Sequence, residues 1–194
     1  MKMKLLSFII YLGILQSCIS IQTKSLSETP GFYSGYKELP KTTQDSIIFT
    51  NTSLDISKIK NDGKIYSITG HQLIESLKKT DSVMVYFWSI YCSSKSCVPL
   101  NIIEQYCKNK NLDLFVITEY YHDFSQIRLQ YRSLEKPLFS INEQFYKTQY
   151  CNKYIKLFRN DLLINQDVSS DDILNNYFVF NKGILTETMK VLPK

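Results

Sequence analysis

The chain has 194 residues, a formal net charge of +5 at pH 7, five cysteines and 44% hydrophobic residues. Lysine and arginine never occupy more than two consecutive positions, so the sequence lacks the basic block typical of nucleic-acid-binding proteins. Residues 47–194, which contain the apolar periodicity, have the length of one ordinary domain, and they contain no internal repeat.

The first residues have the pattern of a secretion signal. Residues 1–4 contain two lysines, residues 5–15 are apolar, and Leu15-Gln16-Ser17-Cys18 follows. The apolar run is too short to span a bilayer, which takes about 20 residues. A small residue before a cysteine, with leucine three positions before it, resembles the lipobox of bacterial lipoproteins. The resemblance implies a signal peptide over residues 1–17 and a lipid on Cys18; an ordinary signal peptide with an incidental Cys18 is the alternative.

Residues 18–46 are rich in Ser, Thr, Gly, Pro and Lys and show no apolar period. This composition predicts a flexible tether from the membrane rather than part of a core. We therefore expect one folded domain over residues 47–194.

Strands and helices are predicted to alternate within that domain. In chain order we expect a strand at 64–70, a helix at 71–80, a buried strand at 82–90, a helix at 98–111, a buried strand at 112–120, a helix at 123–134, a short strand at 136–141, a long helix at 143–163 and a hairpin at 177–192. The hairpin turns at Asn181-Lys182-Gly183, an Asn/Gly type of turn signal. This order predicts an α/β fold with a mixed central sheet, helices on both faces and an antiparallel hairpin at its end.

Cys92 and Cys97 follow the buried strand 82–90 and precede a helix. A cysteine attacks as the thiolate, and a helix N-terminus and the nearby Lys95 would both favour that form. If both cysteines were helical, their spacing would turn the side chains about 140° apart. Pro99 favours a helix that starts near Val98, which would leave residues 92–96 as a loop able to close a disulfide.

Several motifs together resemble the thioredoxin-like fold, and most closely the TlpA-like and ResA-like periplasmic thiol–disulfide oxidoreductases. These motifs are Phe87-Trp88, Tyr91-Cys92 and the hairpin Phe178-Val179-Phe180-Asn181-Lys182-Gly183. The resemblance implies a three-layer sandwich in which Cys92 is the nucleophile and Cys97 resolves the mixed disulfide. It also implies a site lined by Trp88, Tyr91, Lys95 and Pro99. We expect Trp88 to be a core residue near the site rather than a surface for substrate, and we expect no cofactor and no metal.

Two features depart from the family. Its cysteine pair is C-x-x-C, whereas this chain has C-x4-C, and the family's cis-proline before the penultimate strand is replaced by Asn175, with Asn176 beside it. We therefore expect a trans loop of different shape at the inherited substrate site.

Apart from Cys18, the chain has four cysteines: Cys92, Cys97, Cys107 and Cys151. Four cysteines allow three pairings, namely 92–97 with 107–151, 92–107 with 97–151, and 92–151 with 97–107. Of these, the resemblance favours the first. Cys107 and Cys151 are either a structural disulfide or two buried thiols.

A copper site is the weaker alternative chemistry. Cys-x4-Cys-x-Pro loosely resembles the site of Sco-type proteins, but His71 and His122 do not lie late in the chain, where that family has its histidine ligand. Glu119 is expected to be a solvated loop acid, and Tyr146, Tyr150 and Tyr154 to share one helix face.

Together the two resemblances imply a lipid-anchored protein on the periplasmic side of a bacterial membrane. The partners that they imply are protein thiols and disulfides and a membrane reductase. The competing hypothesis is a binding or structural module that kept the fold and lost the reaction.

Overall fold

The computed structural model describes residues 33–89, 96–121 and 130–193. Within these residues seven strands form one sheet in the order β1-β2-β5-β4-β3-β6-β7. Their bounds are β1 (Ile47–Phe49), β2 (Ile65–Ile68), β3 (Ser82–Trp88), β4 (Asp113–Thr118), β5 (Leu138–Ile141), β6 (Tyr177–Asn181) and β7 (Ile184–Met189). The first five strands pair in parallel, while β6 and β7 add an antiparallel hairpin beside β3.

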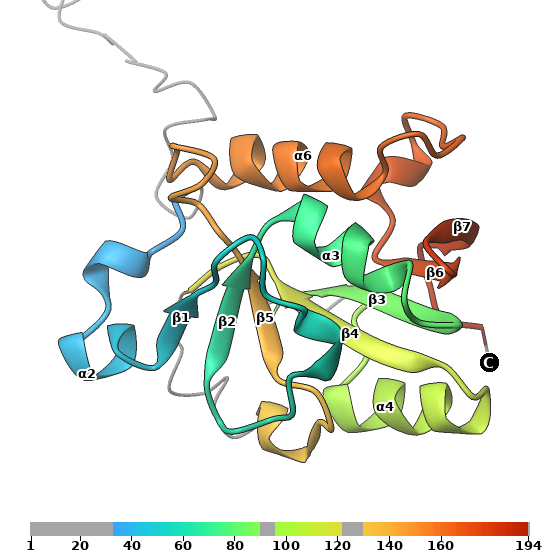
Figure 1. Cartoon of the computed structure of the whole chain (residues 1–194), viewed down its shortest axis with the longest axis horizontal. Helices are drawn as coiled ribbons and strands as arrows, with labels where there is room; N and C mark the ends of the chain where they lie inside the picture. Colours follow the sequence, from blue (N-terminus) through green and yellow to red (C-terminus); the bar gives the residue numbers. More distant parts are fainter. Residues whose placement is uncertain (1–32, 90–95, 122–129, 194) are drawn as a thin grey trace, which may run out of the picture.

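Helices cover both faces of this sheet. Figure 1 shows α3 (Gly70–Leu77) and α6 (Cys151–Leu162) on one face and α4 (Leu100–Asn109) on the other. The predicted α/β fold with a mixed sheet between helical layers is confirmed, and the arrangement is compatible with a thioredoxin-like sandwich. Short helices connect the elements: η2 (Tyr36–Glu38), α2 (Lys41–Gln44), η3 (Ile56–Lys58), η4 (Tyr131–Ser133) and η5 (Asp172–Leu174).

Strand β3 contributes to both hydrophobic cores. Because successive side chains of a strand point to opposite faces, Val83, Val85 and Phe87 pack in the core under α3 and α6. The alternate residues Met84, Tyr86 and Trp88 pack in the core under α4. Burial on both faces explains the continuous apolar run in the sequence.

Local signals explain how α3 begins. The Thr69 side chain accepts a hydrogen bond from the Gln72 backbone N–H, and the Gln72 side chain accepts one from the Thr69 backbone N–H. These reciprocal bonds form a capping box. Gly70 follows, where a Cβ atom would lie 2.3 Å from the Phe158 carbonyl oxygen. The missing side chain therefore lets α3 and α6 approach closely.

The final hairpin is confirmed at the predicted turn. Lys182 and Gly183 have φ values of 51° and 80°, as a type I′ turn requires at its two central positions. This turn sets the register of β7 on β6.

The helix predicted at 143–163 begins later, at Cys151. Residues 143–147 form turns, in which the Asn142 side chain accepts a hydrogen bond from the Phe145 N–H and Lys147 adopts a φ of 53°, and Tyr150 forms an isolated bridge with Tyr33. Tyr146 and Tyr150 therefore share no helix face with Tyr154, and this prediction was wrong. The left-handed backbone of Lys147 interrupts a right-handed helix at this position.

Two further elements differ from the sequence prediction. Strand β1 was not predicted. In the predicted helix 123–134, residues 123–129 lie outside the described residues, and Tyr131–Ser133 form only the short helix η4.

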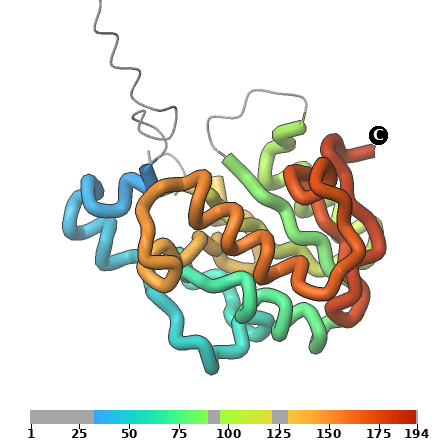
Figure 2. The backbone as a smooth tube through the Cα atoms, turned by 90° about the horizontal axis from the view of Figure 1, so that it is seen from above, coloured from blue at the N-terminus to red at the C-terminus, as the bar shows by residue number. Residues whose placement is uncertain are grey.

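Residues 33–46 belong to the domain rather than to a tether. The Ser34 N–H donates to the Gln149 carbonyl at 2.9 Å, and the Ser34 carbonyl accepts from the Tyr121 N–H at 2.8 Å. Tyr36 packs edge-on against the rings of Phe49 and Tyr121. Figure 2 shows this blue segment beside the orange turns that precede α6. The boundary predicted at residue 47 is too late, because the aromatic side chains find partners far along the chain. Residues 18–32 lie outside the described residues.

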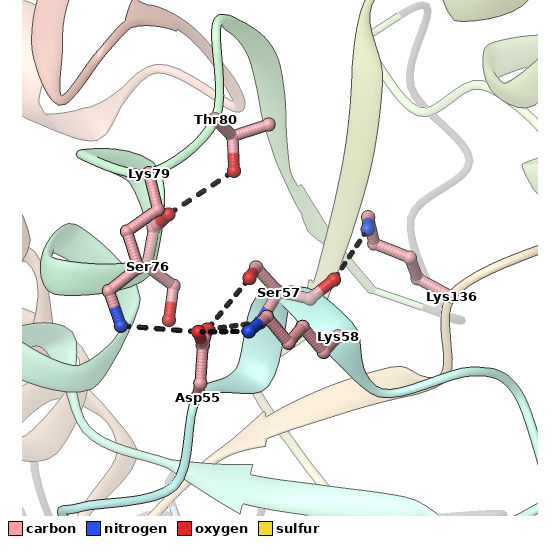
Figure 3. A network of polar contacts seen from close by, with 7 residues as sticks. All are labelled: Asp55, Ser57, Lys58, Ser76, Lys79, Thr80 and Lys136. Atoms are coloured by element: carbon pink, nitrogen blue, oxygen red, sulfur yellow. Dashed lines mark hydrogen bonds and ion pairs between the residues drawn. The ribbon is translucent and has the colours of Figure 1, made fainter.

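A polar network fastens η3 to its neighbours (Figure 3). Asp55 accepts hydrogen bonds from the Ser57 N–H at 3.2 Å and the Ser57 hydroxyl at 2.7 Å, and it forms ion pairs with Lys58 and Lys79. On the other side of η3, the Lys136 ammonium donates to the Ser57 carbonyl at 2.9 Å. The network joins η3 to the end of α3 and to the segment before β5.

No helix of the described chain is long and apolar enough to cross a membrane.

We predict that Gly70→Ala destabilises the fold by about 1–3 kcal/mol, because its methyl group would overlap the backbone of α6. Urea unfolding monitored by circular dichroism measures the change. Gly63→Ala is the control: a Cβ atom there meets nothing within 4 Å, so only the strain at a φ of 78° remains. A Gly70→Ala protein as stable as the wild type would contradict the close approach.

We predict that Asp55→Asn makes the free energy of unfolding less dependent on pH. Hydrogen bonds from Ser57 hold the pKa of the Asp55 carboxyl below its usual value of 3.8, partly opposed by desolvation. A lowered pKa stabilises the fold above the unfolded-state value, and this stability is lost as pH falls through the folded-state value. Urea unfolding at pH 7 and at pH 3 should therefore show a smaller difference in the variant. An unchanged difference would contradict the prediction.

Candidate functional site

The candidate site lies at the carboxyl end of β3, where Cys97 precedes α4. Cys97 is half-buried and disulfide-bonded. The other predicted members of this segment, Tyr91, Cys92 and Lys95, lie outside the described residues, as does the predicted lipidation site Cys18.

A stacked pair of tyrosines holds the backbone on both sides of Cys97. Tyr86 of β3 and Tyr177 of β6 are cross-strand partners, and their ring centroids lie 4.6 Å apart with planes 6° from parallel. The Tyr86 hydroxyl accepts from the Val98 N–H at 3.0 Å and donates to the Val98 carbonyl at 3.1 Å. The Tyr177 hydroxyl donates to the Ser96 carbonyl at 2.7 Å. Two buried phenols thus hold Ser96 and Val98, the residues on either side of Cys97.

Both phenols remain neutral donors in this setting. Burial raises the pKa of Tyr86, and burial together with the neighbouring Tyr86 raises that of Tyr177. The sequence analysis missed this pair, although Tyr86 immediately precedes the Phe87-Trp88 motif.

Helix α4 begins at Leu100, close to the start that Pro99 predicted. Pro99 is the N-cap residue with a φ of −55°, and its carbonyl accepts from the N–H groups of Ile102 and Ile103. Cys97 therefore lies in non-helical backbone before the helix. Its position relative to a second cysteine is not fixed by helix geometry, which allows the Cα separation that a disulfide needs.

Trp88 lies in the core rather than on a surface of the site. Its side chain is buried under α4 with Leu100 and Ile103. Trp88 therefore supports the carboxyl end of β3 and offers no exposed ring to a substrate.

The loop at Asn175 and Asn176 faces the Cys97 segment. The Asn176 carbonyl accepts from the Phe87 N–H at 2.8 Å, and its side-chain amide donates to the Ser96 carbonyl at 3.5 Å. The Asn175 side chain turns away toward Asp172 and Thr188. The peptide bonds of this described loop are trans. Of the two predicted asparagines, only Asn176 contacts Ser96, the residue before Cys97.

A buried ion pair, also missed by the sequence analysis, supports the same loop from α6. Arg159 pairs with Glu119 at 3.0 Å, and the two side chains are 6% and 16% exposed. The expectation that Glu119 is a solvated acid was wrong, because the Arg159 side chain of α6 reaches Glu119 just after the end of β4. Burial lowers the pKa of Arg159, and Glu119 opposes that shift.

Cys107 and Cys151 are buried free thiols, so the second of the two alternatives is confirmed and the structural disulfide between them is absent. Cys107 packs in the core under α4, whereas Cys151 packs in the core under α3 and α6, on the opposite face of the sheet. Burial raises the pKa of each thiol to about 12. Both alternative pairings that joined these residues to Cys92 or Cys97 are excluded by the same finding.

The described residues contain no cluster of three His, Cys, Asp or Glu side chains that could hold a metal ion. His71 instead lies 3.5 Å from an Asp161 carboxylate oxygen. His122 lies outside the described residues.

No protein-family model matches the chain, and neither curated proteins nor solved structures gave a match.

We predict that Tyr86→Phe lowers the free energy of unfolding by about 1–3 kcal/mol, because it leaves the N–H and carbonyl of Val98 without their partner. Tyr177→Phe removes one hydrogen bond and should cost about 1 kcal/mol. Urea unfolding measures both changes. Tyr66→Phe, which loses an exposed bond to Asp62, is the matched control. Equal stabilities of Tyr86→Phe and this control would refute the role of the stacked pair.

Proposed function

We propose that the chain is a membrane-anchored, extracytoplasmic thiol–disulfide exchange protein that acts through Cys92 and Cys97. The observation that supports this most directly is the disulfide at Cys97, held in non-helical backbone before α4 at the carboxyl end of a parallel strand. In open α/β sheets, ligands and reactive groups gather at that edge.

The cysteine inventory supports Cys92 as the partner. Cys107 and Cys151 are free, so Cys92 and Cys18 are the remaining candidates among the five cysteines. Cys92 precedes Cys97 by five positions and follows the same strand, β3. A loop of this length between two cysteines can adopt the Cα separation that a disulfide needs, about 4.4–6.8 Å.

The proposed reaction has two balanced steps. The Cys92 thiolate attacks one sulfur of a substrate disulfide, which breaks that bond and releases the second substrate sulfur as a thiolate. The Cys97 thiolate then attacks the Cys92 sulfur, closes the Cys92–Cys97 disulfide and releases the other substrate sulfur. The substrate gains two electrons and takes up two protons, and the chain is oxidised by the same two electrons. A membrane reductase would restore the dithiol, as the TlpA-like and ResA-like resemblance implies.

The proposed anchor is a lipid on Cys18, with the domain on the periplasmic side of a bacterial membrane. Because the described domain begins at Tyr33, the connecting chain would span at most about 50 Å when fully extended. The exchange site would then operate near the membrane, within reach of a membrane reductase.

One observation favours the alternative, a non-catalytic binding module. A cavity of about 590 Å³ lies between α4, the start of β4 and the segment before β5, on the edge of the sheet opposite Cys97. Apolar and charged residues line it in similar number, and the charged ones are Lys58, Lys60, Glu104, Lys108, Asp113, Glu135 and Lys136. The volume is within the usual range of small-molecule sites.

A glutathione redox series on the purified protein, read by alkylation and peptide mass mapping, tests the proposal. We expect Cys92 and Cys97 to interconvert as a pair at a potential above about −300 mV. Cys107 and Cys151 should resist alkylation until the protein unfolds, because burial raises the pKa of each thiol.

Cys18→Ser is the matched control for the pairing. If Cys92 is the partner, the disulfide at Cys97 persists in this variant. A disulfide that stays locked well below −300 mV, or that is lost with Cys18, would contradict the exchange function and favour the binding module.

A further inference from the structure

Helix α6 places a buried arginine behind the candidate site, on the face of the sheet opposite α4. The Arg159 guanidinium lies 3.8 Å from the centroid of the Phe87 ring. One of its terminal nitrogens donates to the carbonyls of Ile173 and Asn175, at 2.6 Å and 2.8 Å. The other donates to Glu119 at 3.0 Å.

These bonds hold the loop that faces Cys97. The two carbonyls that Arg159 binds belong to the residues on either side of Leu174. Asn176 follows them directly, and its carbonyl accepts a hydrogen bond from the Phe87 N–H of β3. The Asn176 amide and the neighbouring Tyr177 hydroxyl both donate to the Ser96 carbonyl. A continuous series of contacts therefore runs from α6 through this loop to the residue before Cys97.

Stability alone is a poor reason for such an arginine. Burying an ion pair costs several kcal/mol of desolvation, and apolar residues of similar volume often stabilise a fold equally well. The rings of Phe87 and Phe178 would accept an apolar neighbour. A planar guanidinium adds what an apolar side chain lacks, because its several donors can bind two carbonyls and a carboxylate in fixed directions.

We propose that Arg159 is a positioning residue that stabilises the disulfide form of the Cys97 site. The structure contains the disulfide, and the contacts to Ser96 are made in that state. Loosening the loop at residues 173–176 removes support from the disulfide form and makes reduction easier. The catalytic meaning of this role rests on the proposed exchange function.

Arg159→Lys tests the proposal in the full-length protein. Lysine keeps the positive charge but cannot bind both carbonyls and Glu119 in the same geometry. We expect the equilibrium with glutathione to shift about tenfold toward the dithiol, which for two electrons is a potential about 30 mV higher. Arg132→Lys, at an exposed arginine of η4, is the matched control and should leave the equilibrium unchanged.

Glu119→Gln is a milder second variant, in case Arg159→Lys fails to fold. It keeps an acceptor for Arg159 and removes the opposite charge, so we expect a shift of about threefold in the same direction. Urea unfolding of each variant identifies those that fold. A folded Arg159→Lys or Glu119→Gln protein with the wild-type equilibrium would overturn the positioning role and leave the exchange function intact.

Failure of the exchange function gives a different result. If the wild-type disulfide does not equilibrate with glutathione, the exchange function is overturned. The rate of Cys97 disulfide reduction by dithiothreitol then decides the positioning role: several-fold faster reduction in Arg159→Lys supports it, and an unchanged rate overturns it.

Discussion

The antiparallel pairing of β3 with β6 is the interaction on which the rest of the site depends. Its register places Tyr86 opposite Tyr177, so that both rings stack and both hydroxyls reach the backbone around Cys97. The same pairing brings the Phe87 N–H to the Asn176 carbonyl. A slip of one residue would move every side chain of β6 to the opposite face of the sheet and separate the two phenols. The geometry around the disulfide is therefore a consequence of strand register.

Because β3 is buried on both faces, the site is supported from both sides of the sheet. On the α4 side, the two tyrosines bind the segment that contains Cys97. On the α6 side, Arg159 stacks on Phe87 and binds the loop before β6. These two supports meet at the Ser96 carbonyl, which accepts from both Asn176 and Tyr177. A change in either layer is thus transmitted to the residue next to the disulfide.

Local patterns predicted the architecture, and long-range contacts decided what they missed. The apolar run of β3, the strands and helices from β2 to β4 and the turn at Lys182-Gly183 follow local signals, and each appears in the structure as expected. Arg159 and Glu119 are 40 positions apart, so no local pattern reveals their pairing. The docking of Ser34 likewise depends on Tyr121 and Gln149, in a segment whose polar composition indicated a tether. Cys107 and Cys151 could be assigned as free thiols only once their helices were placed on opposite faces of the sheet.

Thiol–disulfide exchange is the central claim, and trapping its intermediate tests it most directly. In a Cys97→Ser protein incubated with oxidised glutathione, the Cys92 thiolate would attack the glutathione disulfide and release one glutathione, with no resolving thiol left to reverse the adduct. Peptide mass mapping should then find one glutathionyl group on Cys92, and none there in Cys92→Ser. A Cys92 that stays unmodified in the folded Cys97→Ser protein would contradict the exchange mechanism.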